Sequence, residues 1–179
     1  MGVWDVLAET DRVQWTYTPS VSVGPLRFEM SPDEVVSALE GFTGTVDSAS
    51  PYTKDRRGEF RNIGIAAHRT AVTVYFGESE GLFCVVPDAQ FGPQVTLDGV
   101  RLVGRIPSQL EAELDEYLSS RGIVGRYAPG GDLGAEELGI LMSVQRAGDV
   151  VLTRPALLIP QERAYTLWDA LPSGEGSIR

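Results

Sequence analysis

The chain has 179 residues and a mass of 19.4 kDa, with 42% apolar and 22% charged residues, and this composition predicts one globular domain over residues 1–179. A single Cys excludes a disulfide framework, and one Cys with one His leaves too few soft ligands for an ordinary structural zinc site. The net charge of −10 would repel a polyphosphate and an anionic membrane surface. We therefore expect neither nucleic acid nor a membrane as a direct partner.

The negative charge is concentrated in the C-terminal part of the chain. Residues 1–75 carry 10 acidic and 7 basic side chains, a net charge of −3, whereas residues 76–179 carry 15 and 8, a net charge of −7. This imbalance favours a basic protein partner for the second half. The alternative is that the negative charge only keeps the protein soluble.

The N-terminal residues, MGVWDVLAE, contain early acids and neither a basic leader nor a long apolar run. They predict no secretory signal and no transmembrane helix. A cytoplasmic location is the resulting expectation.

An internal repeat is suggested by an offset of 75 residues, which aligns the segment beginning at Gly24 with the one beginning at Gly99. The same offset aligns Val35 with Leu110, Leu39 with Leu114, and residues 63–65 with 138–140. It predicts two half-repeats, approximately residues 22–90 and 97–162. The alternative is that amphipathic helices and strands of similar length align easily by chance.

Each predicted half-repeat starts with a helix. In the first, Ser31 and Glu34 form a capping box around Pro32, and the helix ends by Gly41. In the second, Ser108 is predicted to cap a helix that ends at Gly122. Its apolar face comprises Leu110, Leu114, Tyr117 and Leu118.

Three antiparallel strands are predicted after each helix, at residues 59–67, 71–76 and 82–86 and at residues 138–145, 149–153 and 156–159. Pro155 and Pro160 indicate that the last strand lies at a sheet edge. The predicted fold is α+β, with two tandem half-repeats forming an antiparallel sheet and the helices packed on one face. Residues 172–179 are expected to form a mobile tail.

The run VGPLRFEMSPDEV at residues 23–35 resembles the G-x-x-x-G-M-[ST]-x-x-E-V opening of the β-lactamase inhibitor protein and the small outer-membrane assembly lipoproteins, with Glu29 where the motif has Gly. In those proteins helices pack on an antiparallel sheet, and the inhibitor is a tandem duplication. The resemblance implies a binding protein.

Catalytic patterns in the sequence favour structural interpretations. The run GESEG at residues 77–81 matches G-x-S-x-G, but a strand follows it and the only histidine, His68, precedes Ser79, so we expect a turn. His68 lies between two predicted strands and is interpreted as a turn residue rather than a general base. Cys84 lies within a predicted strand, where packing is expected rather than thiolate chemistry.

Acidic residues cluster at 111–116 and 132–137, and helical spacing places Glu111 and Asp115 on one face. Such like-charge neighbours favour a cationic partner, whereas a solvated helix face is the alternative. No EF-hand spacing is present.

Two long loops, residues 41–57 and 122–137, are candidates for function because they contain aromatic and basic residues typical of binding surfaces. The alternative is that they are variable surface loops.

We predict a non-enzymatic cytoplasmic protein-binding module, an immunity or inhibitor protein that masks a basic toxin or enzyme site. The alternatives are a small-ligand-binding protein or unrecognised enzyme that uses the concave sheet face, and a subunit of a larger assembly that docks through the last strand. No catalytic, cofactor-binding or metal-binding residues are assigned. The candidate partner-binding residues are Glu111, Asp115, Glu116, Tyr127, Asp132, Glu136, Tyr52 and Arg56.

Overall fold

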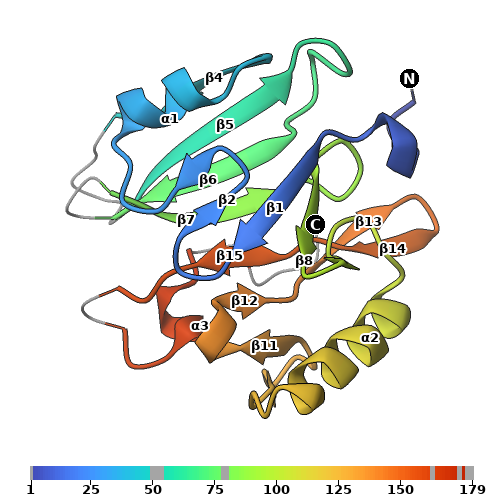
Figure 1. Cartoon of the computed structure of the whole chain (residues 1–179). Coiled ribbons are helices and arrows are strands. Elements are labelled where there is room, and N and C mark those ends of the chain that lie inside the picture. The colour runs from blue at the N-terminus through green and yellow to red at the C-terminus, as the bar shows by residue number, and fades with distance from the viewer. Residues whose placement is uncertain (1, 49–54, 78–80, 162–163, 173–174, 176–179) are drawn as a thin grey trace.

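A computed structural model describes residues 2–48, 55–77, 81–161, 164–172 and 175 of the chain. Over these residues it contains fifteen strands, three α-helices and two short 3-10 helices. The strands form one sheet of eight, one of five and a separate two-stranded hairpin (Figure 1). The predicted α+β fold of two half-repeats, each a helix followed by three strands, is therefore wrong, because the structure is built mainly from packed sheets.

The eight-stranded sheet is antiparallel throughout and runs from the top to the bottom of Figure 1. Its strand order is β4 (Phe42–Val46), β5 (Arg56–Asn62), β6 (Val72–Phe76), β7 (Leu82–Pro87), β15 (Ala156–Leu158), β12 (Ile140–Leu141), β11 (Leu133–Ala135) and β10 (Arg126–Tyr127).

The five-stranded sheet is mixed, because β1 and β8 run parallel and pair Gln14 with Gln94. Its order is β3 (Leu26–Arg27), β2 (Ser22–Val23), β1 (Gln14–Thr18), β8 (Gln94–Leu97) and β9 (Val100–Arg101). The remaining hairpin pairs β13 (Val144–Ala147) with β14 (Val150–Thr153). The 3-10 helices are η1 (Glu9–Asp11) and η2 (Glu136–Leu138).

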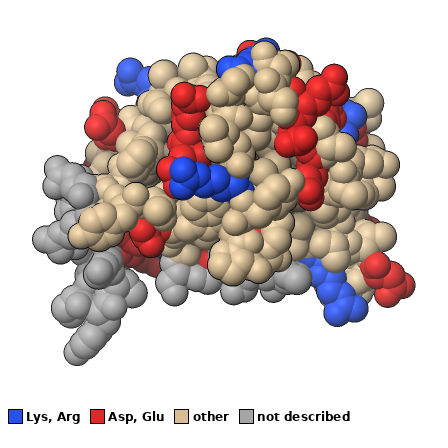
Figure 2. All heavy atoms as spheres, turned by 90° about the horizontal axis from the view of Figure 1, so that it is seen from below, with Lys and Arg blue, Asp and Glu red and all other residues tan. Residues whose placement is uncertain are grey.

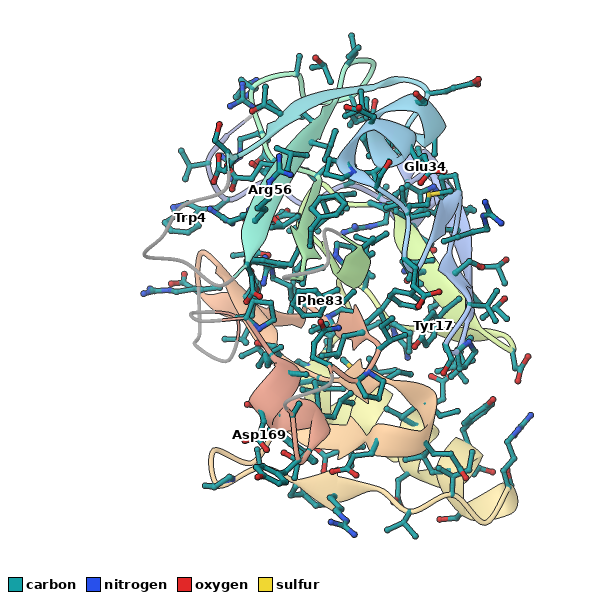
Figure 3. All side chains as sticks on the ribbon, turned by 90° about the vertical axis from the view of Figure 1, so that its left-hand side faces the viewer. Trp4, Tyr17, Glu34, Arg56, Phe83 and Asp169 are labelled. Atoms are coloured by element: carbon teal, nitrogen blue, oxygen red, sulfur yellow. The ribbon has the colours of Figure 1, made fainter. Side chains whose placement is uncertain are left out.

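The main core lies between the two large sheets, and a second apolar cluster covers the other face of the eight-stranded sheet. The first includes Tyr17 and Val74, and the second includes Tyr75 and Phe83. Figure 3 shows Tyr17 and Phe83 on either side of this sheet. Burial on both faces explains why β6 and β7 read as continuous apolar runs rather than as alternating patterns.

A bulge between β6 and β7 sets which side chains enter each core. The pairing register shifts at Tyr75 and Phe76, so that Phe76 pairs with Leu82 and Tyr75 with Cys84. Phe83 is the extra residue of the bulge. The bulge lets Leu82 and Val85 face the same core although they are three positions apart.

The first helix, α1 (Pro32–Ala38), confirms its predicted start. The Ser31 side chain accepts from the Glu34 backbone N–H at 3.3 Å, and the Glu34 carboxylate accepts from the Ser31 N–H at 2.8 Å. The bond from the Ser31 N–H, with a smaller contribution from the Ser31 side chain, holds the pKa of the Glu34 carboxyl group below its usual value. Val35 is buried against the main core, whereas Val36 is exposed.

The second helix, α2 (Pro107–Ser120), buries the predicted apolar face but lacks the predicted cap. It begins at Pro107, so Ile106 occupies the N-cap position and makes no side-chain cap bond. The prediction of a cap at Ser108 is wrong because Ser108 is already inside the first turn. None of the helices in the described part of the chain combines the length and the apolar character that crossing a membrane requires.

The third helix, α3 (Leu167–Ala170), contributes to the second apolar cluster, whereas the first two helices contact the main core. Thr166 and Asp169 form a capping box at its start. The prediction that the helices pack on one face of the sheet is therefore wrong. The three helices cover different parts of the two sheets (Figure 1).

The 75-residue offset aligns one unit only, a two-residue hairpin turn followed by a helix. Gly24 and Gly99 both have positive φ in such turns, and Pro32 and Pro107 both begin helices. Beyond the helices the halves diverge: α1 leads into the β4–β7 meander, whereas α2 leads into the short strands β10 and β11.

Local turn chemistry explains where other predicted strands end. The strand predicted over residues 59–67 corresponds to β5 and ends at Asn62. The Asn62 side-chain oxygen accepts from the Gly64 N–H at 3.0 Å, and this bond starts a turn. The strand predicted over residues 138–145 starts only after Gly139, whose φ is 65°, and it divides at residues 142–143 into β12 and β13 of two different sheets. Glu29, at the Gly position of the motif, likewise has a left-handed φ of 70°.

The last strand of the eight-stranded sheet is internal. β15 pairs with β12 on one side and with β7 on the other, so the prediction of an edge strand is wrong. Pro155 and Pro160 flank the strand rather than lie in it, and its ladder therefore keeps every donor.

Candidate functional site

The candidate site is built around the N-terminal half of α2. The buried side chains of this helix, at Leu110, Leu114, Tyr117 and Leu118, fix its rotation. Glu111 and Asp115, which lie one turn apart, are therefore exposed on its outer surface. The sequence prediction that these two acids share an exposed helix face is confirmed.

The other end of α2 is tied to the β8–β9 turn. The Tyr117 hydroxyl donates to Asp98 Oδ2 at 2.6 Å, and the Arg121 guanidinium lies 3.7 Å from the centre of the Tyr117 ring. Burial and the bond to Asp98 raise the pKa of Tyr117. These contacts make α2 a fixed support for the acids on its surface.

Tyr127 on β10 extends the acidic surface. Its hydroxyl donates to Glu111 Oε1 at 3.0 Å, and its side chain is 55% exposed. The bond to Glu111 raises the pKa of Tyr127, and the charge of Asp115 contributes to the same effect. The structure therefore brings Tyr127, from the predicted loop 122–137, beside Glu111 and Asp115, which the sequence already placed together on one helix face.

A small cavity lies beside this cluster, with Glu111 and Asp132 among its lining residues. Its volume is about 80 Å³, well below the roughly 300–1,000 Å³ of typical small-molecule pockets. The lining residues are otherwise apolar or neutral: Pro107, Leu110, Gly131, Leu133, Met142, Ser143, Val144 and Thr153. The cavity therefore suits a single side chain with an apolar stem.

Asp132 is partly withdrawn from water at this cavity, and burial raises the pKa of its carboxyl group. Over the described residues, no ion pair neutralises Glu111 or Asp132. Glu113, in contrast, pairs with Arg105 at 2.9 Å. The cavity thus has two carboxylates and no basic residue among the residues that line it.

The remaining candidate residues are not part of this cluster. Glu116 is exposed on α2, and Glu136 is exposed in η2, at the far end of β11 from Asp132. Arg56 lies on β5, five strands from β11, which corresponds to about 24 Å across the sheet. Figure 3 shows Arg56 at the other end of the molecule from Asp169. Tyr52 lies outside the described residues.

The face of the molecule on which α2 lies shows acidic side chains in separate clusters, with neutral surface and a basic group between them (Figure 2). The acids are therefore not spread evenly. Their grouping leaves neutral surface beside each cluster, where a partner can make apolar contacts.

Residues with catalytic patterns lie apart from this cavity. His68 is exposed in a turn after β5, and Cys84 is fully buried in β7, where burial raises the pKa of its thiol. The prediction that Cys84 packs within a strand is confirmed. Ser79 lies outside the described residues. Within the ranges described, no three metal-ligating side chains come together.

Sequence reasoning missed a buried ionic cluster formed by Tyr75, Arg154 and Glu175. Glu175 belongs to the segment predicted as a mobile tail, yet its side chain is buried and paired with Arg154. A signal for this cluster was the charged Arg154 within an apolar run. Glu175 gave no such signal, because it lies among Gly and Ser residues.

Comparisons of the chain with protein-family models, with curated proteins and with solved structures gave no match.

Proposed function

We propose that the chain is a protein-binding module whose α2 cavity accepts a basic side chain of a partner protein. The observation that carries the proposal is the pair of carboxylates, Glu111 and Asp132, at a cavity whose lining is otherwise apolar or neutral. Lys and Arg side chains combine an apolar stem with a cationic end. The stem would occupy the cavity and the cation would lie against the two carboxylates.

The desolvation of Asp132 supports this assignment. A carboxylate with a raised pKa carries its charge at a cost, and a bound cation offsets that cost. Tyr127 adds an exposed ring beside Glu111, and tyrosine is enriched among residues that dominate binding energies. Its ring can also contact a guanidinium face.

The charge of the whole chain favours the same type of partner. A net charge of −10 accelerates encounter with a basic surface, an effect that weakens as salt screens it. The finer form of the proposal is an immunity or inhibitor protein that masks a basic toxin or enzyme site.

The two alternative functions have less support from the described residues. The face of the large sheet that packs against the five-stranded sheet is filled by the main core rather than open to a ligand. The strand proposed for docking in a larger assembly, β15, is internal to its sheet. The α2 cavity is therefore the better-supported site.

The test begins with capture of partners by the tagged full-length protein from its native host at low salt. The captured protein is purified, and its dissociation constant is measured with wild-type chain and with Glu111→Gln/Asp132→Asn. The matched control is Glu40→Gln/Asp149→Asn, which removes the same two charges at exposed positions on other elements. The proposal requires that only the first variant weakens binding.

Two results would count against this function. One is that no stoichiometric protein partner is recovered at low salt. The other is a partner whose affinity falls equally with both double variants, because net charge rather than the cavity would then explain the binding.

A further inference from the structure

The C-terminal segment places one charged residue deep in the protein. Glu175 is 1% exposed and Arg154, its ionic partner, is 5% exposed. Arg154 Nη1 donates to one carboxylate oxygen of Glu175, and the Tyr75 hydroxyl donates to the other. Both oxygens are therefore held by donors from residues that precede the tail.

The backbone of Glu175 is held as well. The Ser143 hydroxyl donates to its carbonyl oxygen at 3.1 Å, and its own N–H donates to the Pro172 carbonyl at 3.1 Å. The Arg154 backbone N–H donates to the Ser143 carbonyl at 2.8 Å, and this bond fixes Arg154 and Ser143 relative to each other. Arg154 and Tyr75 thus hold the side chain of Glu175, and Ser143 holds its main chain.

The surroundings favour an anion. Arg57 lies opposite Tyr75 in the β5–β6 pairing, and its buried Nε lacks a hydrogen-bond partner among the described residues. Arg57 also forms an ion pair with Glu59 at 2.7 Å. Asp55 and Cys84 are the other titratable groups nearby, and Cys84 is affected by the charges of both Glu175 and Arg154. Arg154 therefore pairs directly with Glu175, and the charge of Arg57 acts on Tyr75, the other side chain that donates to the Glu175 carboxylate.

We infer that Arg154, Tyr75 and Ser143 form a carboxylate-binding pocket that the C-terminal segment of the same chain occupies through Glu175. We call this arrangement the tail latch. Breaking a buried ion pair is costly, yet forming one from solvated charges gives little net stabilisation, and ordering a chain end is unfavourable. The latch therefore adds only a modest net stabilisation, and a glutamate presented in a similar turn of another protein can replace Glu175.

The inference is tested in the full-length chain with Glu175→Ala, and with Glu137→Ala as the control at an exposed glutamate. Removal of Glu175 leaves Arg154 buried without its carboxylate, and we expect Tm to fall by about 5–15 °C. The second readout is the rate at which a thiol reagent labels Cys84, the only cysteine in the chain. We expect labelling to accelerate about tenfold or more in Glu175→Ala and to remain unchanged in Glu137→Ala.

The decisive step is rescue by acetate, which restores the carboxylate that the substitution removes. Sodium acetate, compared with sodium chloride at equal ionic strength, should raise the Tm of Glu175→Ala and slow the labelling of Cys84. It should do neither in the wild type nor in Arg154→Met/Glu175→Ala, where the guanidinium is absent.

Two results would overturn the tail latch. If Glu175→Ala matches the wild type in Tm and in labelling, the tail does not dock. If it is destabilised but acetate has no effect beyond chloride, the ion pair is structural and the pocket does not bind carboxylates. If Glu175→Ala does not fold, Glu175→Gln replaces it; accelerated labelling of Cys84 supports docking, and a wild-type rate contradicts it.

Discussion

Asp132 is the residue in the candidate site whose charge is least favoured by its surroundings. Its pKa is raised by burial, whereas Glu111 beside it accepts a hydrogen bond from Tyr127. Binding sites commonly contain a charged group that destabilises the free protein but strengthens binding of the partner. The residue therefore allows a test of the site without a partner.

Asp132→Asn should stabilise the free protein at pH 7. The folded-state pKa of Asp132 lies above its ordinary value of 3.8, so its stabilising contribution is present at low pH and is lost as pH rises through the folded-state pKa. We expect a gain of about 0.5 kcal/mol at pH 7, measured by urea denaturation, that disappears at a pH below 3.8. Asp149→Asn, at an exposed turn, should change nothing; a loss of stability in Asp132→Asn at pH 7 would contradict the assignment.

Two glycines with left-handed backbone differ in the space around them. A Cβ on Gly139 would lie 2.2 Å from the Leu158 carbonyl oxygen, whereas a Cβ on Gly99 would meet nothing within 4 Å. We expect Gly99→Ala to cost about 1 kcal/mol and Gly139→Ala about 3 kcal/mol or more, measured by urea denaturation. Equal costs at the two positions would show that close packing at Gly139 has no role.

Single residues were predicted well where local chemistry decides the outcome. The Ser31 capping box and the packing of Cys84 follow from short sequence patterns, and both are present. The burial of Glu175 depends on Tyr75, 100 positions earlier in the chain. No local pattern contains that information.

Elements were predictable where their apolar pattern is regular, as for the helical spacing in α2 and the continuous apolar runs of β6 and β7. Boundaries failed where one residue changes the backbone, as at Asn62 and Gly139. The starts of α1 and α2 show the same contrast. The sequence patterns around Ser31 and Ser108 are similar, but only Ser31 caps its helix. The two serines should therefore differ in their contribution to the free energy of unfolding.

Ser31→Ala should destabilise the protein by about 1 kcal/mol, because α1 loses the side-chain acceptor for the Glu34 N–H. Ser108→Ala should change stability by less than about 0.5 kcal/mol, because Ser108 makes no cap bond in α2. Urea denaturation of both variants measures the two changes in the free energy of unfolding. A larger loss for Ser108→Ala than for Ser31→Ala would contradict the observed helix starts.

At the scale of the whole molecule, the order of strands could not be predicted from the sequence. β15 inserts between β7 and β12, and β1 pairs with β8 in parallel, so neighbours in space come from distant parts of the chain. The repeat suggested by the 75-residue offset reflects a shared hairpin and helix start rather than a shared architecture. The grouping of acids on α2, by contrast, was already visible in the helical spacing.

The molecular surface combines a high negative charge with a cavity whose lining contains two carboxylates and no basic residue. Long-range charge would steer a basic partner, and the cavity would fix its orientation. These two contributions differ in their response to salt, because exposed charges are screened and a desolvated pair is screened much less.

The most direct test of the proposed function is therefore the dissociation constant for the captured partner, measured for wild type, Glu111→Gln/Asp132→Asn and Glu40→Gln/Asp149→Asn at low and at physiological salt. The account predicts that the cavity variant binds about ten- to a hundredfold more weakly at both salt concentrations, while the control stays within about threefold of wild type. Equal weakening by the two double variants, or wild-type affinity in the cavity variant, would contradict it.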